Sequence, residues 1–366
     1  MNKLSCTTVA ISISTLLSGS VLANEEKAHT PATSADFSGN FRVGFISEED
    51  DDGEHTNNSA FGGELSYISS NWHGLSLGTT LYTTQKLLNE DNGNLFASDG
   101  SSYAILGEAY LQANLAHTEV KIGRFGFDSP HADMDDIRMI PNTVSGILLT
   151  NSGISNTTLY FAHIDKWAGV GTEQPEKFTE MNGDEGISVL GAVFEGIEHV
   201  NLNTWYYHGN NFADLFYVDA VYEVNNFTIG AQFGSQYDNS EDHTGPDGNV
   251  YGIMASYTVN DFTLTSAYNK VSGNIINGFG GGPFFSNAAD HTIDGVIDQS
   301  ALAIRLDYTG IDGLTLGLLH VVFKKGSDET DVFVSYDFGK DMTVDVTYHN
   351  MYEDGDMVLA MFNVGF

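Results

Sequence analysis

The sequence has few cysteines and no long apolar run after its first two dozen residues. Beyond Ala23, no stretch approaches the roughly 18 consecutive apolar residues of a membrane-spanning helix. This excludes a helical membrane protein. The single cysteine is Cys6, which lies ahead of the expected cleavage site. We therefore expect a mature protein with no disulfide and no thiol chemistry.

Basic residues are also scarce. The chain has 14 Lys and Arg against 49 Asp and Glu, which gives a formal net charge of −35. Nucleic-acid binding needs basic patches, so a nucleic-acid partner is disfavoured. The acidic run at 48–52 is interpreted as a solvated loop, and bridging to lipopolysaccharide through divalent cations is the alternative. No calcium-loop pattern is found, and we expect neither a cofactor nor a metal site.

Two features of the N-terminus indicate export. Lys3 precedes the weakly apolar segment 8–17, and Val21-Leu22-Ala23 has the small-residue spacing of a cleavage site. A membrane anchor is the alternative, but the apolar segment is short for it. The predicted organisation is a signal peptide at 1–23 cleaved between Ala23 and Asn24, a short polar lead at 24–36, and a barrel at 37–366. The lead is too short for a plug domain.

An exported chain with 6 prolines, 40 glycines and 40 tyrosines and phenylalanines together (17 and 23) favours an all-β fold. A transmembrane antiparallel β-barrel has apolar side chains toward lipid and polar side chains toward water, so neither forms a continuous run. A secreted β-sandwich or solenoid is the runner-up, although no fixed-period repeat supports a solenoid.

The C-terminus has the pattern of a closing barrel strand. One face of residues 357–366 carries Val358, Ala360, Phe362, Val364 and Phe366. A final strand of about 10 residues that ends on an aromatic resembles the C-terminal signal of Gram-negative outer-membrane barrels. We expect this strand to pair with residues 37–45 and to be recognised by the barrel-assembly machinery.

Alternation predicts further strands along the chain. Leu75, Leu77 and Leu81 fall on one face, opposite Ser76 and Thr80. The next segment is predicted with Tyr103, Ile105, Ala109 and Leu111 on one face, opposite Glu108 and Gln112. In the second half we expect strands at 187–195, 197–208, 212–224, 226–237, 249–259, 261–271, 297–308, 313–325, 329–338, 342–352 and 357–366.

Short and long connections alternate between these strands. Links such as Asn225-Asn226 and Asn260-Asp261 are typical of hairpin turns on the periplasmic side. The longer links suit the extracellular side. We predict about 18 strands, a size that leaves an aqueous lumen. Aromatic residues recur near the expected strand ends and predict girdles at the two membrane interfaces.

Residues 123–146 follow a predicted strand, contain two prolines and lack clean alternation, and long loops of this kind are often functional. Their motifs are Gly123-Arg124, Ser129-Pro130, Asp136-Ile137-Arg138 and Pro141-Asn142-Thr143 with Gly146. This pattern resembles the inward-folded third loop of OprD-type porins. Gly281-Gly282-Pro283-Phe284-Phe285, within a second long loop at 272–296, is similar to another segment of that family. The resemblance implies an 18-stranded outer-membrane barrel whose narrow channel passes small, often charged nutrients.

A barrel of this size would be a wide water channel unless a loop folds into it. We expect the loop at 123–146 to narrow it. Its acidic residues Asp133, Asp135 and Asp136 are predicted to form one wall, with Arg124 and Arg138 on the opposite side. Such a transverse field would select charged solutes. The alternative is that these residues pin the loop to the barrel wall by ion pairs.

The charge of the lumen wall also follows from alternation. The bases predicted to point inward are Arg42, Lys86, Lys121 and Arg305. The acids predicted inward are Glu64, Glu108, Glu119, Asp219, Glu223, Asp307, Asp337 and Asp345. Family members that favour carboxylates have a ladder of arginines and lysines, and here that ladder is thin. The sum of the charges predicted on the lumen wall is negative and favours the passage of cations.

The sequence therefore predicts a porin for passive diffusion of small hydrophilic solutes and ions in the outer membrane. An enzyme or adhesin on a barrel scaffold is the alternative, but no catalytic motif is found. No nucleophile can be paired by spacing with His163, His199, His208, His320 or His349. We interpret His208, His243 and His291 as loop or rim residues. A homotrimer is expected only by analogy with porins.

Overall fold

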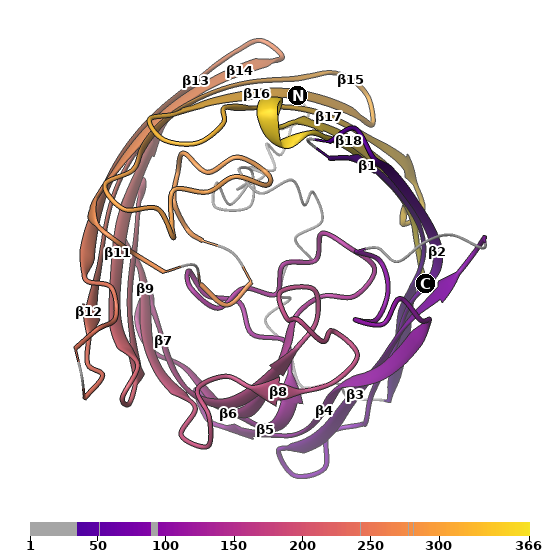
Figure 1. The fold of residues 1–366 in the computed structure, drawn as a ribbon. Helices are drawn as coiled ribbons and strands as arrows, with labels where there is room; N and C mark the ends of the chain where they lie inside the picture. The colour runs from indigo at the N-terminus through magenta and orange to yellow at the C-terminus, as the bar shows by residue number, and fades with distance from the viewer. Residues whose placement is uncertain (1–34, 51, 89–93, 242, 277, 281) are drawn as a thin grey trace, which may run out of the picture.

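The computed structural model describes residues 35–366 except 51, 89–93, 242, 277 and 281 (Figure 1). The predicted signal peptide and almost all of the predicted lead lie outside these residues. The described strands are β1 (Asp36–Glu49), β2 (His55–Ile68), β3 (Leu75–Lys86), β4 (Tyr103–Leu115), β5 (Thr118–Phe125), β6 (Thr143–Ile154), β7 (Thr157–Ala168), β8 (Thr179–Glu180), β9 (Ile187–Ile197), β10 (Val200–Gly209), β11 (Ala213–Val224), β12 (Phe227–Asp238), β13 (Gly248–Val259), β14 (Phe262–Gly273), β15 (Ser300–Ile311), β16 (Leu314–Phe323), β17 (Glu329–Gly339), β18 (Met342–Asn350) and β19 (Asp356–Gly365).

The described strands form one closed antiparallel sheet. Each pairs with its neighbours in chain order, and β1 pairs with both β2 and β19. Only β8 stands apart, because it is two residues long and pairs with β7 alone, which also pairs directly with β9. The wall therefore has 18 of the 19 strands. The predicted barrel and its strand number are confirmed.

The closing strand lies where the C-terminal pattern predicted. Its register against β1 runs from Asn40 opposite Gly365 to Glu49 opposite Asp356. The amides of Gly39 and Phe366 donate to each other's carbonyl oxygens at 3.0 Å. The first and last strands thus satisfy each other's backbone groups, as a membrane barrel requires.

Alternation separates the two faces of the wall. On β3, Leu77 and Leu81 are 47% and 45% exposed, whereas Ser76 and Thr80 are buried on the inward side. The outward face is thus apolar, as a lipid-facing surface must be. No helix among the described residues is long enough and apolar enough to cross a bilayer.

Tight turns join the strands at one end of the barrel. Asn156, Asn225 and Asn260 take positive φ values of 55°, 53° and 52° in three of them. Asn tolerates this left-handed backbone better than most residues, which explains its recurrence in these turns. Most connections at the other end are longer. We call these the short-turn end and the long-loop end.

On β4 the direction in which the first side chains face differs from the prediction. Ile105 was expected on the outward face with Leu111, but it is buried and its neighbour Leu106 is 43% exposed. The cause is a β-bulge, because Thr80 pairs with Glu108 whereas Leu81 pairs with Leu106. The extra residue in β4 exchanges the inward and outward faces for the residues of β4 that precede it.

Aromatic side chains mark the short-turn end. Phe227 packs against Tyr257 with ring centroids 4.5 Å apart, and Phe262 packs against Tyr308 at 4.7 Å. Each pair lies across neighbouring strands beside a turn. This is the position of an interfacial girdle.

The interior is less polar than the sequence suggested. Two clusters of buried apolar side chains lie inside the barrel, and both include loop residues together with inward-facing strand residues. Met139 and Ile140 from a loop contact the group that contains Ile46 and Met361, for example. Inward apolar positions therefore hold loops that fold into the lumen, as Figure 1 shows for the magenta and orange segments.

Candidate functional site: two inward loops

The first inward loop covers residues 126–142, between β5 and β6. The predicted bounds of 123–146 were too wide, because 123–125 and 143–146 belong to the two strands. Within the loop, the amide of Ser129 donates to the carbonyl of Ala132 at 2.8 Å. The amide of Asn142 donates to Met134 at 2.6 Å. These bonds give the loop a defined shape despite its lack of regular structure.

A second inward loop covers 274–299, between β14 and β15. It was predicted at 272–296, but residues 272 and 273 are still strand. The two loops join by a short parallel bridge between Ala132 and Phe279. There the amide of Asp133 donates to Phe279 O at 2.9 Å, and the amide of Phe279 donates to His131 O at 2.8 Å. The loops are therefore one connected unit across the lumen.

Arg42 on β1 holds the first loop to the wall. Its guanidinium donates to both carboxylate oxygens of Asp136, at 2.7 and 2.9 Å, and to the carbonyl of Arg138 at 2.5 Å. Its Nε donates to Asn363 on β19 at 2.7 Å. A bidentate, charge-assisted pair fixes both distance and orientation. Asp136 is thus a loop anchor, which is the alternative that the sequence left open.

His131 anchors the same loop by packing. Its ring lies edge-on to three aromatic rings, those of Tyr207, Tyr217 and Phe284, at centroid distances of 5.5 to 5.9 Å. Its amide donates to the Tyr207 hydroxyl at 3.1 Å, and that hydroxyl donates to Ser129 Oγ at 3.1 Å. Burial lowers the pKa of His131 to about 4, so the ring is neutral at neutral pH.

Two loop aspartates lie close together. Asp133 Oδ1 accepts the amide of Asp135 at 2.9 Å. Burial raises the pKa of Asp133, and burial together with the charge of Asp133 raises the pKa of Asp135 to about 7. Asp135 lines a cavity of about 260 Å³ between the loops, together with Asp294, whose pKa burial raises to about 6.

Arg138 lines a different cavity, of about 480 Å³, with Tyr103, Met139 and Glu173 among its other walls. Its side chain makes only long contacts, to Ile137 O at 3.4 Å and to Met357 Sδ at 3.8 Å. Among the described residues Arg138 forms no ion pair within 4.0 Å. The loop therefore offers Asp135 and Arg138 to two separate spaces.

The predicted residues Lys121, Arg305 and Glu108 lie on the inward side of the wall, and the two bases are each close to a carboxylate. Lys121 Nζ is 3.5 Å from Glu119 Oε1 and 5.4 Å from the centre of the Tyr110 ring. Arg305 Nε donates to both Asp307 oxygens at 2.9 Å.

Glu108 is held by its neighbours on both sides. It accepts from Thr80 Oγ1 at 3.0 Å and from the amide of Gly126 at 3.2 Å. It thus connects β3 to the start of the first inward loop.

Arg124 does not line the constriction as predicted. It is exposed on the same side of β5 as Ile122, whereas Phe125 points inward and is buried. Its guanidinium lies 4.4 Å from the centre of the Phe178 ring and donates to Leu106 O at 3.2 Å. The strand continues past Gly123, so alternation places Arg124 outward.

A closed barrel with loops folded across its lumen defines the class of an outer-membrane porin. A sequence profile described as outer membrane porin, OprD family, matches residues 75–291. The chain belongs to the OprD family of outer membrane porins. The long-loop end is then the extracellular side. A search of curated protein sequences found no match.

Solved porin structures share the fold at low sequence identity. Pseudomonas aeruginosa OpdK with vanillate matches with a TM-score of 0.79 at 17% identity, covering 92% of this chain and 99% of that one. Pseudomonas aeruginosa OccK8 (OprE) matches with 0.79 at 14% identity over the same shares. A BenF-like porin from Pseudomonas fluorescens Pf-5 matches with 0.78 at 15% identity, again over 92% and 99%.

Sequence reasoning missed several residues that build the site. Tyr207 and Tyr217 on β10 and β11 surround His131, and Asn363 on β19 shares Arg42 with the loop. Alternation gives their inward facing, which was the available signal. Which loop residue each contacts depends on the path of the loop.

Proposed function

We propose that this porin passes small hydrophilic, charged solutes by passive diffusion and that its channel prefers cations. The observation that carries the proposal is the pairing of the inward bases. Arg42 lies 2.7 Å from Asp136, Lys121 lies 3.5 Å from Glu119, and Arg305 lies 2.9 Å from Asp307. Each of these three wall bases has its own carboxylate, so none of the three supplies an uncompensated positive field.

Acidic residues remain after this pairing. Glu64 and Asp345 lie on the inward side of the wall near Arg42, whose one charge already faces Asp136, and Glu108 lies near Glu64. In the loops, Asp135 and Asp294 line the same cavity. Charges within such a low-dielectric channel act over longer distances than in water, so a net negative lining attracts cations.

Arg138 adds a positive charge on one side of the first inward loop. Arg138 lines the cavity of about 480 Å³, whereas Asp135 lines the cavity of about 260 Å³. We propose that these two charges set a transverse field that orients a zwitterionic or cationic solute at the constriction.

The ligand of a structural neighbour is not carried over. OpdK was solved with vanillate, an aromatic carboxylate. We propose that the present channel disfavours such anions, because the wall bases Arg42, Lys121 and Arg305 already have carboxylate partners and Arg138 is left as a single base among several acids.

Planar-bilayer recordings test the proposal. Under a KCl gradient we expect the reversal potential to have the sign that indicates cation selectivity. We expect the double variant Asp135→Asn with Asp294→Asn to have a smaller reversal potential. The control is Asp99→Asn, in an exposed loop where the carboxylate accepts the amide of Ser101 at 2.9 Å. An anion-selective wild-type channel would overturn the preference. Absence of any conductance from a folded barrel would overturn the diffusion function itself.

Liposome swelling identifies the solute class. We expect lysine and arginine to enter faster than glutamate or vanillate, with neutral sugars between. Equal rates for all solutes of one size would mean that the loop charges exert no selection.

We also propose that a cleaved signal peptide directs export and that the assembly machinery recognises the strand ending at Phe366. The pairing of that strand with β1 supports the second point. Association into a homotrimer is a proposal by analogy with porins, and contact of the acidic run at 48–52 with lipopolysaccharide through divalent cations is a proposal from its charge.

A further inference from the structure

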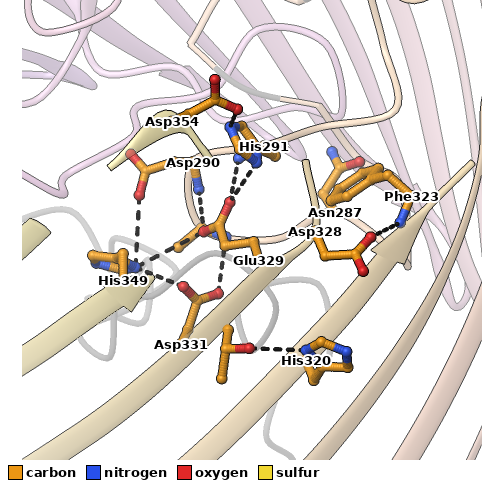
Figure 2. Close-up of polar contacts among 12 residues, drawn as sticks. Asn287, Asp290, His291, His320, Phe323, Asp328, Glu329, Asp331, His349 and Asp354 are labelled. Carbon is orange, nitrogen blue, oxygen red and sulfur yellow. Dashed lines mark hydrogen bonds and ion pairs between the residues drawn. The ribbon is translucent and has the colours of Figure 1, made fainter. Parts of the chain in front are cut away.

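A cluster of ionisable side chains lies at the long-loop end, where the second inward loop rests on the wall (Figure 2). The loop contributes Asp290 and His291, β17 contributes Glu329 and Asp331, and β18 contributes His349. None of these residues lines either of the two cavities beside Asp135 and Arg138. Three separate stretches of chain thus converge on one place.

The donor atoms have the spacing of metal ligands. One ligand atom each from Asp290, Glu329 and His349 lies within 4.8 Å of the other two. His349 Nδ1 is 2.8 Å from Asp331 Oδ1, 3.6 Å from Asp290 Oδ2 and 4.0 Å from Glu329 Oε1. Four ligands bound tetrahedrally at about 2.0–2.2 Å lie about 3.3–3.6 Å apart. The observed distances fall on both sides of that value.

Burial makes the cluster's charge significant. The side chains of Glu329 and Asp331 are 0% exposed and that of His349 is 5% exposed. With Asp290, three carboxylates face one imidazole. A divalent cation bound among these groups would reduce the cost of burying several acidic side chains together.

The second nitrogen of His349 is held as in metal-binding histidines. Its Nε2 lies 2.9 Å from Thr347 Oγ1. Nδ1 lies 2.8 Å from Asp331 Oδ1, so without a cation Nδ1–H donates to this carboxylate. With a cation bound, Nε2–H would donate to the Thr347 hydroxyl, and the Nδ1 lone pair would face the cation among the carboxylates. Metal-bound histidines usually donate their other N–H to such a partner, which fixes the ring orientation and tautomer.

The carboxylates are also oriented in advance. Glu329 accepts the amides of Asp290 and His291 at 2.9 and 2.7 Å, and Asp331 accepts the amide of Ala289 at 3.3 Å. These bonds hold the loop against the wall, and each leaves carboxylate lone pairs for another ligand. His291 Nδ1, 3.4 Å from Glu329, is buried and has no hydrogen-bond partner.

We propose that Asp290, Glu329, Asp331 and His349 bind one divalent transition-metal ion, for which Zn²⁺ is the probe. Imidazole among the oxygen ligands favours such an ion over Ca²⁺ or Mg²⁺, which prefer oxygen alone. The ion would join the second inward loop to β17 and β18. This proposal departs from the expectation from sequence, which assigned no metal site and placed His291 on the rim.

Isothermal titration of the full-length mature barrel in detergent, after treatment with EDTA, tests the binding. We expect one Zn²⁺ per chain. His349→Ala should weaken binding by about 10- to 100-fold, as loss of a ligand or its immediate support does. Asp290→Asn is the second variant, because it alters only the loop and leaves the wall strands unchanged.

Matched controls lie beside the cluster. His320 bonds to Thr330 at 2.8 Å, and Asp328 accepts the amide of Phe323 at 3.0 Å (Figure 2). His320→Ala and Asp328→Asn should bind Zn²⁺ as the wild type does. Each variant is first checked for a closed barrel by its heat-dependent mobility in gels.

Three outcomes would overturn the site: no Zn²⁺ binding by the folded wild type, equal loss in His320→Ala and His349→Ala, or equal affinity for Ca²⁺. The titration involves no current, so its failure is independent of the channel proposal. Addition of Zn²⁺ to the EDTA-treated channel should also reduce current fluctuations, and His349→Ala should abolish this effect.

Discussion

Arg42 and Asp136 are joined by two hydrogen bonds of 2.7 and 2.9 Å, although 94 positions separate them in the sequence. Arg42 belongs to the first strand of the wall and Asp136 to the first inward loop. The pair therefore transmits the position of the wall to the constriction. Its partners include Asn363 on the closing strand, so barrel closure and loop placement depend on the same guanidinium.

Arg42→Met should release the first inward loop. The substitution keeps most of the side chain's volume but removes hydrogen bonds to charged and carbonyl acceptors, at a cost of about 1.5–3 kcal/mol in loop anchoring. Single-channel recordings should show larger or more variable conductance. Arg305→Met is the control, because the partner of Arg305 is Asp307 on its own strand. Unchanged conductance in Arg42→Met would mean that the remaining contacts suffice to hold the loop.

Cation preference should rise with pH through Asp135. Its pKa, raised to about 7, means that about a tenth of the molecules carry this charge at pH 6 and about nine tenths at pH 8. The reversal potential under a salt gradient should therefore shift toward the cation limit over this range. Asp135→Asn should flatten the shift, whereas Glu241→Gln, in an exposed loop, should keep it. A shift of equal size in all three proteins would assign the titration to other groups.

His131 should make the barrel less stable in acid. Its pKa is about 4 in the folded chain, against 6.5 for an ordinary histidine. The neutral ring therefore stabilises the folded barrel fully above pH 6.5, and this stabilisation is lost as the pH falls toward 4. Across that window the loss is about 1.4 kcal/mol for each pH unit. His131→Phe, which retains an aromatic ring, should reduce this slope in urea unfolding measured by tryptophan fluorescence. The difference between the two proteins isolates His131 from the loop aspartates, whose raised pKa values act in the opposite direction. Equal slopes in both proteins would contradict the neutral, buried ring.

Phe366 should matter for assembly and leave the open channel unchanged. Its backbone closes the barrel through Gly39, while the residue as a whole is 70% exposed at the short-turn end. Deletion of Phe366 should lower the amount of barrel in outer-membrane fractions, and the molecules that do assemble should keep the wild-type conductance. Tyr352, an exposed aromatic at the other end, provides the comparison through Tyr352→Ala. Normal outer-membrane levels after the deletion would contradict a role in assembly.

The strands of the barrel wall could be predicted from the sequence because the signals for a strand lie within a few neighbouring residues. Period-two alternation and turn residues such as Asn225 and Asn260 are read within a few positions, and Phe366 marks the closing strand. Ile105 shows the limit of this rule, since a bulge adds one residue without an obvious signal and reverses the facing on one side.

The interior was much harder to predict. Alternation places Arg42 inward, but only the path of the loop decides that its partner is Asp136. Arg124 was assigned to the channel from its place in a family-like motif, and the continuation of β5 turns it outward. The cluster around His349 draws on three distant segments, so no local spacing could predict it.

The bridge between Ala132 and Phe279 has a consequence for protein engineering. Because each inward loop supplies backbone hydrogen bonds to the other, neither is an exchangeable module. A graft of one loop from a relative would meet an edge shaped for a different partner. Altered solute choice would be reached more readily by transplanting both segments together, or by substituting single side chains such as Asp135 that lie outside the bridge.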